Sequence, residues 1–198
     1  MRSSSASSTP RCRCRGRCSR TSSSRGAGSG KVSVSILPID VYGANADTPA
    51  FDVGRGLYEA LSRHANIINL SLAGSSDSAL VKGLIEDARS HGVLFVAAAG
   101  NEPVTTPTYP AADPGVLAAT AGDARGGIAS YANRGPFVDV IAPGVNVVHY
   151  QDAAWFGTGT SFATTWVSGW AAGFMASAGH HSSPATQAAT LERWRLVR

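Results

Sequence analysis

Residues 31–198 contain no cysteine, because the three cysteines of the 198-residue chain stand at positions 12, 14 and 18. Because residues 31–198 have no cysteine, this part of the chain is compatible with any redox environment. A zinc site at the three cysteines would need a fourth ligand, and no histidine lies closer to them than His64. Long apolar runs are also lacking: the longest, residues 93–99, is far shorter than the roughly 20 residues that cross a bilayer. We therefore expect neither a metal site nor a membrane span.

The first 30 residues lack Val, Ile, Leu, aromatic and acidic residues, and hold ten Ser and seven Arg. Such a segment buries too little apolar surface to offset its ordering entropy, so residues 1–30 are predicted to be a disordered Ser/Arg/Cys-rich tail. The tail has no apolar signal-peptide core, and the compartment stays unknown. Residues 31–198 hold ten Lys and Arg against thirteen Asp and Glu, so the body is mildly acidic. A basic-tailed nucleic-acid-binding protein is therefore the least favoured function.

Apolar patterning predicts one α/β domain over residues 31–198. Strands are indicated by the runs at 31–43, 67–72 and 93–99. Helices are indicated by the one-sided apolar patterns at 52–64 and 75–92, and further helices are expected at 161–179 and 184–195. The run 93–99 is apolar on both faces, which is typical of a central parallel strand. Alternating strands and helices predict a three-layer α/β/α fold with a mostly parallel sheet.

Two segments place reactive groups where strands and helices meet. The strand-like run AAAGN (97–101) stops at Gly100 and is followed by Asn101. In FGTGTSFAT (156–164), glycines lead to Ser161 at the start of a predicted helix. A helix N-terminus offers unpaired N–H groups, which suit a developing oxyanion. Each signal alone is weak, because serine at a helix start is usually a cap and asparagine after glycine usually a turn.

Together with two other blocks, these segments carry a family resemblance. The four blocks are NLSLAG (69–74), VAAAGNE (96–102), ASYANRGPFVDVIAPGV (129–145) and GTSFAT (159–164). In this order they resemble the subtilisin-like serine proteases (the subtilase, or peptidase S8, family) over about residues 31–180. The match is to the C-terminal part of the catalytic domain, so the resemblance implies a partial subtilisin-like peptidase domain over 31–198 whose N-terminal part is missing.

The resemblance implies a role for each matched residue. Ser161 is implied as the nucleophile, and Asn101 as the oxyanion-hole amide acting with the backbone N–H of Ser161. Residues 71–74 would pair with extended substrate as an added strand. Residues 98–100 would form one wall of the pocket for the side chain before the cleaved bond, with Glu102 at its rim and Thr108 at its base. The implied substrate-binding residues are thus Ser71, Leu72, Ala73, Gly74, Ala98, Ala99, Gly100, Glu102 and Thr108.

The resemblance also implies a cis bond between Tyr109 and Pro110. The expected partner is a polypeptide substrate, with no nucleic acid and no membrane, and the chain is expected to be a monomer. No cofactor is expected, although the family resemblance leaves structural calcium open.

The Asp and His of the catalytic triad have no counterpart. In the family the triad residues follow one another in the order Asp, His, Ser, and the Asp and His both precede the block that residues 31–43 match. Residues 1–30 of this chain contain neither Asp nor His. No histidine stands at the family's position: the five are His64, His91, His149, His180 and His181. A serine without a base is a poor nucleophile, so inactivity of this chain is implied. Two accounts stay open: an endopeptidase whose N-terminal part was lost to truncation or a wrong gene model, or a non-catalytic domain that at most binds peptides.

Overall fold

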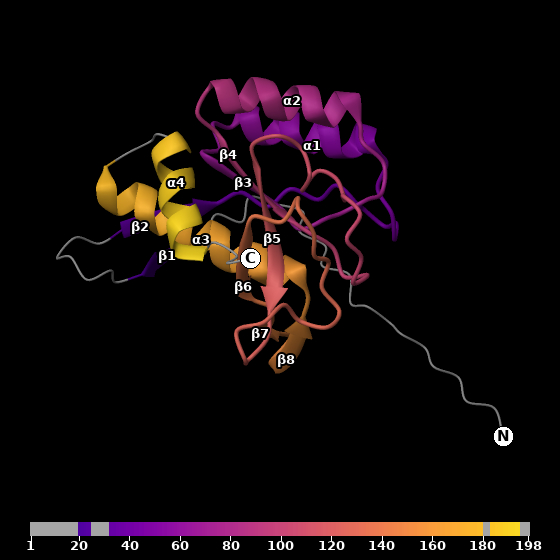
Figure 1. Ribbon diagram of the computed structural model, residues 1–198. Coiled ribbons are helices and arrows are strands. Elements are labelled where there is room, and N and C mark those ends of the chain that lie inside the picture. The colour runs from indigo at the N-terminus through magenta and orange to yellow at the C-terminus, as the bar shows by residue number, and fades with distance from the viewer. Residues whose placement is uncertain (1–19, 25–31, 180–182, 195–198) are drawn as a thin grey trace.

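The computed structural model describes residues 20–24, 32–179 and 183–194. Figure 1 shows the chain as a central sheet with helices on both sides and a small hairpin at one end. In chain order the elements are β1 (Arg20–Ser24), β2 (Val32–Ile36), α1 (Ala50–Ser62), β3 (Ile67–Leu70), α2 (Ala79–Ser90), β4 (Leu94–Ala98), β5 (Val116–Gly122), β6 (Val140–Pro143), β7 (Val145–Tyr150), β8 (Ala153–Thr158), α3 (Thr160–Ala178) and α4 (Ser183–Trp194).

The central sheet has the strand order β3-β4-β5-β6, and all its neighbouring strands run parallel. Every residue of β4 is buried, which confirms the prediction of a central strand covered on both faces. The carboxyl ends of the four strands therefore lie at one edge of the sheet. Polar residues that follow these strands gather at that edge.

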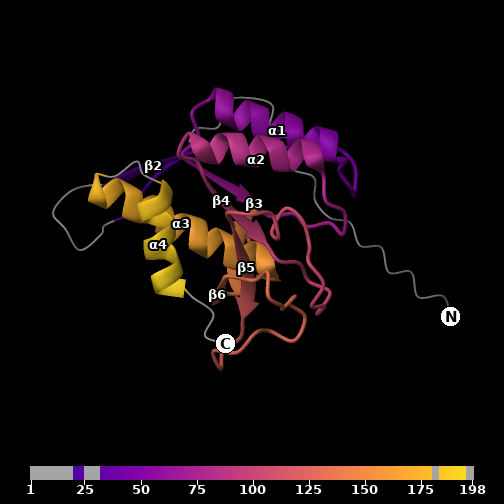
Figure 2. The same ribbon diagram turned by 45° about the horizontal axis from the view of Figure 1, so that its top comes forward.

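Two apolar clusters hold the helices to opposite faces of the sheet, which gives the three-layer architecture that the patterning predicts (Figure 2). On one face, Phe95 and Ala97 of β4 pack with Leu57 of α1 and Ile85 of α2. On the other face, the alternate residues of β4 and β5 pack against α3. The α3 side chains in that cluster are Ala163, Val167, Ala171 and Met175. Successive side chains of β4 point to opposite faces of the sheet, so neighbouring residues of this strand belong to different clusters.

The helices lie close to their predicted positions. α2 begins four residues later than the pattern suggests, because the hydroxyl of Ser78 accepts the Val81 N–H at 3.4 Å and caps the helix there. α3 ends at Gly179, whose left-handed backbone (φ +63°) terminates it. The bond between Tyr109 and Pro110 is cis, as expected. No helix among the described residues is long and apolar enough to cross a bilayer.

Two parts of the chain differ from the expectations. The strand predicted over 31–43 ends at Ile36, and the Asp40 carboxylate then closes a turn by accepting the N–H groups of Tyr42 and Gly43. Arg20–Ser24, inside the tail predicted to be disordered, forms β1 and pairs antiparallel with β2. Backbone pairing needs no apolar side chain, so composition did not reveal it. The other tail residues lie outside the described residues, and a domain boundary at residue 30 stays a prediction.

Candidate active site

Ser161 lies in the first turn of α3, directly after a tight reversal of the chain. β8 ends at Thr158, Gly159 turns with φ +151°, and α3 begins at Thr160. A side chain at Gly159 would be strained, and its Cβ would lie 3.5 Å from the Asn101 amide nitrogen. That distance is an ordinary van der Waals contact, so the backbone conformation, and not the space beside Asn101, favours glycine here.

The Asn101 carboxamide is bonded to the start of α3. Its Oδ1 accepts the Thr160 backbone N–H at 2.9 Å and the Thr160 hydroxyl at 3.1 Å. The Thr160 hydroxyl oxygen in turn accepts the Gly100 N–H at 3.2 Å. Because a backbone N–H can only donate, the carboxamide oxygen faces the helix and the NH₂ group occupies the other position. The structure thus brings together the segments that carry Asn101 and Ser161.

Two hydrogen-bond donors remain available at this place. Within the described part of the chain, neither the Asn101 NH₂ group nor the Ser161 N–H has a hydrogen-bond partner. Asn101 is exposed and Ser161 is half-buried, so solvent and ligands reach both. The N-terminus of α3 adds a partial positive charge. This arrangement can bind an oxygen that becomes negatively charged.

A buried asparagine, whose role the sequence did not reveal, fixes the loop that carries Asn101. Asn133 is 1% exposed; its Nδ2 donates to the Ala99 carbonyl at 2.7 Å and its Oδ1 accepts the Glu102 N–H at 2.8 Å. A Cβ at Gly100 (φ +103°) would lie 2.5 Å from the Asn133 Nδ2, so only glycine fits there. Asn133 belongs to the block at 129–145, but its contacts could be found only from the tertiary structure.

The proposed substrate segment, residues 71–74, follows the carboxyl end of β3. Gly74 forms an antiparallel bridge with Tyr109, through Gly74 N–H to Tyr109 O at 2.9 Å and Tyr109 N–H to Gly74 O at 2.8 Å. Ser168 of α3 donates to Asn69 Oδ1 at 3.0 Å, and Asn69 Nδ2 donates to the Ser71 hydroxyl at 2.8 Å. These bonds connect the segment to α3, whose first turn contains Ser161.

The residues of the proposed neighbouring pocket are also close to one another. Ala98 and Ala99 are buried at the end of β4, and the Thr108 hydroxyl donates to the Ala99 carbonyl at 2.6 Å. Glu102 is exposed, and its backbone N–H donates to Asn133 Oδ1, whereas its carboxylate has no hydrogen bond within the described ranges. The roles of these residues in substrate binding stay predictions.

The described histidines lie away from Ser161. His64 follows α1 and His91 follows α2, at the amino-terminal edge of the sheet, opposite Asn101. His149 pairs with Ala154 near the tip of the β7–β8 hairpin, four residues from the end nearest α3. At about 3.3 Å per residue this separation is roughly 13 Å. His180 and His181 lie outside the described residues.

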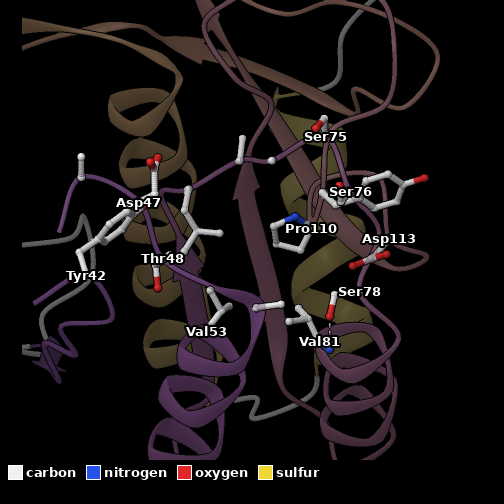
Figure 3. A pocket seen from close by; sticks show the side chains of 16 residues that line it. Tyr42, Asp47, Thr48, Val53, Ser75, Ser76, Ser78, Val81, Pro110 and Asp113 are labelled. Carbon is white, nitrogen blue, oxygen red and sulfur yellow. Dashed lines mark hydrogen bonds between the residues drawn. The ribbon is translucent and has the colours of Figure 1, made fainter.

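The described residues contain no group of three or more His, Cys, Asp or Glu side chains that could hold a metal ion. A cavity of about 340 Å³ is lined in part by the bridged residues Gly74 and Tyr109; Figure 3 shows this cavity. Leu72, Ala73 and Gly74 line it, whereas Ser161 and Asn101 do not.

Comparisons with known proteins agree with this geometry. The sequence profile of the Subtilase family matches residues 17–194. Subtilisin BL of Lederbergia lenta is 35% identical over 136 residues, which are 68% of this chain and 51% of that protein. A thermostable alkaline protease of Halalkalibacterium halodurans is 36% identical over 136 residues, 68% of this chain and 38% of that protein.

Solved structures show the same likeness. The prenylagaramide maturation protease PagA is similar with a TM-score of 0.65 and 28% identity, over 71% of this chain and 55% of that chain. The chain spans about half the length of Subtilisin BL and of PagA, and less of the alkaline protease.

Proposed function

Because the chain belongs to the subtilase family, we propose that it carries the nucleophile and the oxyanion hole of a serine endopeptidase. Ser161 is the proposed nucleophile, and the Asn101 NH₂ group and the Ser161 N–H are the proposed oxyanion donors. The observation that supports this best is the pair of hydrogen bonds from Thr160 to Asn101 Oδ1, because they hold Asn101 at the start of α3 and leave its NH₂ group without an acceptor among the described residues.

The proposed chemistry follows from these groups. The Ser161 oxygen attacks the carbonyl carbon of the scissile peptide, and the carbonyl oxygen becomes an oxyanion that receives two hydrogen bonds. The C–N bond then breaks, the amine leaves with a proton, and water hydrolyses the acyl-enzyme. In subtilisin, loss of the oxyanion asparagine lowers turnover by about 10²–10³; this value comes from that relative.

Proton removal from Ser161 requires a base. The three described histidines lie at the opposite sheet edge or along the β7–β8 hairpin, so none is placed to accept this proton. We therefore propose that the 198-residue chain alone does not cleave peptides at the rate of a protease. Subtilisin without its triad still accelerates hydrolysis by roughly 10³–10⁴-fold over the reaction in water, and this acceleration comes from the oxyanion hole and substrate binding alone.

A second candidate function is peptide binding without turnover. The exposed residues Ser71 and Ala73 favour it, because an extended peptide can pair with this segment whether or not a base is present. Gly74 is excluded from this pairing, since its N–H and carbonyl are bonded to Tyr109. This function predicts binding of peptides that remain intact.

Reaction with a fluorophosphonate tests the proposed nucleophile, with imidazole supplied as the base. The Ser161 oxygen forms a bond to phosphorus, the P–F bond breaks, and imidazole takes the hydroxyl proton. We expect slow labelling without imidazole and labelling that rises with imidazole concentration, measured by intact mass and peptide mapping. Asn101→Leu should slow labelling by about 10²-fold, as expected for loss of one oxyanion donor.

Ser161→Ala is the control for the site, and Ser177→Ala, near the far end of α3, is the matched control for an exposed serine. Equal labelling of wild type and Ser161→Ala would overturn the assignment of the nucleophile. Rapid hydrolysis of a peptide by the chain without imidazole would overturn the proposed need for an added base.

A further inference from the structure

The cavity beside residues 71–74 has the size and composition of a side-chain-binding site. Its volume of about 340 Å³ falls within the range of about 300–1,000 Å³ that is common for ligand sites. Its walls come from the loop before α1, the first turn of α1, residues 72–78 and the turn after Tyr109 (Figure 3). It therefore adjoins the segment along which an extended peptide is proposed to lie.

Part of the cavity wall is apolar. Val53 of α1 and Val81 of α2 are each 6% exposed, and Figure 3 shows them at neighbouring helix ends below Pro110. Leu72 of the proposed substrate segment continues this surface. An aliphatic stem can pack along these side chains.

A buried carboxylate completes the wall. Asp113 is 5% exposed, and its Oδ1 has no hydrogen-bond partner among the described residues. Figure 3 shows this carboxyl group beside the cavity, between Ser76 and Ser78. Burial raises the pKa of Asp113, and the negative charges of Asp77 and Glu86 raise it further, whereas Lys82 lowers it. An unpartnered buried carboxylate is costly, and a cationic ligand would remove that cost.

The other charged group of the cavity is also acidic. Asp47 lines the side opposite Asp113, and it is exposed where the cavity opens. None of the described residues that line the cavity is Lys, Arg or His. An anionic side chain would be repelled there, and a purely apolar one would offer no hydrogen-bond donor to Asp113 Oδ1.

We propose that this cavity binds a basic side chain, lysine or arginine, of an extended polypeptide paired with residues 71–73, and that Asp113 determines this preference. The stem of the basic residue packs on Val53, Leu72 and Val81, and its cationic head pairs with the Asp113 carboxylate. The inference rests on the proposed function for its substrate class, a polypeptide, and adds the side chain that is selected.

Binding of matched peptides tests the inference without requiring catalysis. A series of fluorescent Ala/Ser/Gly decapeptides carries one arginine, moved through each position, and a second series carries citrulline in its place. Citrulline has a similar shape to arginine without its charge. We expect one position at which arginine binds about 10- to 100-fold more tightly than citrulline, since a charge-assisted hydrogen bond in a partly buried site has this effect. The measurement is fluorescence anisotropy with the full chain.

Two variants assign the effect to Asp113. Asp113→Asn should remove the difference between arginine and citrulline and leave citrulline binding unchanged. Asp87→Asn on the exposed surface of α2 is the matched control and should leave the difference intact. Equal binding of arginine and citrulline peptides at every position of the wild-type chain would overturn the inference, as would absence of binding to both series. The wild-type comparison stays decisive if Asp113→Asn fails to fold.

Failure of this inference and failure of the proposed function are distinguishable. Imidazole-assisted labelling of Ser161 together with equal arginine and citrulline binding would refute the basic preference only. A clear arginine preference with labelling that does not depend on Ser161 would refute the nucleophile and leave the cavity assignment in place.

Discussion

Replacement of Asn133 by alanine should destabilise the chain and disturb the site together. The variant loses the short bonds of Asn133 to the Ala99 carbonyl (2.7 Å) and the Glu102 N–H (2.8 Å). The Ala99 carbonyl keeps the Thr108 hydroxyl as a partner, so the net loss is about 0.5–1.5 kcal/mol for each bond. The void left by a side chain that is 1% exposed adds to this loss. We expect the free energy of unfolding to fall by about 2–3 kcal/mol in urea titrations.

The same variant should slow the imidazole-assisted labelling of Ser161 at least 10-fold, because a displacement of about 1 Å at a reacting site costs as much as 10² in rate. The matched control is Asn146→Ala, since among the described residues Asn146 Oδ1 bonds only to the adjacent Val147 N–H. The control should change stability by less than about 0.5 kcal/mol. An Asn133→Ala chain as stable as the control, with unchanged labelling, would refute the role of Asn133 as the support of Asn101.

Two further predictions concern Asp113 and the β7–β8 hairpin. The raised pKa of Asp113 means that the native chain binds more protons than the unfolded chain above about pH 4, so ionisation of Asp113 lowers the free energy of unfolding as pH rises. Asp113→Asn should remove this contribution, so the stability difference between variant and wild type should grow as pH rises from about 4 through the raised pKa of Asp113, and stay constant above it, in urea titrations. A stability difference that does not change with pH would contradict this explanation. On the hairpin, the cross-strand neighbours Val147 and Phe156 are 51% and 72% exposed, and this apolar surface favours association between chains over the monomer that the resemblance implies. We expect sedimentation experiments to show self-association that decreases when both residues are replaced by threonine, and an unchanged distribution would exclude this surface.

The sequence pattern predicted the buried central strand and the helices that cover the sheet. The fully apolar run at 93–99 became β4, and the small-residue run at 161–179 became α3, because burial on both sides of the sheet selects those residues. By contrast, β7 and β8 pair exposed residues in an antiparallel hairpin, where neither a continuous apolar run nor a helical period is present. β1 depends on pairing with β2, which composition does not encode.

In the candidate site, too, some residues could be predicted from the sequence and others became apparent only in the structure. Ser161 and Asn101 could be proposed from the sequence because both lie at the ends of predicted regular elements within recognisable blocks. Asn133 and Asp113 were missed, since each acts through contacts with segments distant along the chain: Asn133 with the loop after β4, and Asp113 with the cavity between α1 and α2. A buried polar residue gives no periodic signal, and its partners become visible only in three dimensions.

The most direct test of the central claim is a crystal structure of the chain after phosphonylation by the fluorophosphonate. If Asn101 and the helix start form an oxyanion hole, the phosphonyl group is bonded to the Ser161 oxygen. One of its oxygens then lies about 2.7–3.1 Å from both the Asn101 amide nitrogen and the Ser161 backbone nitrogen. A phosphonyl oxygen that points to solvent, or a phosphonyl group bonded to another residue, would contradict the account.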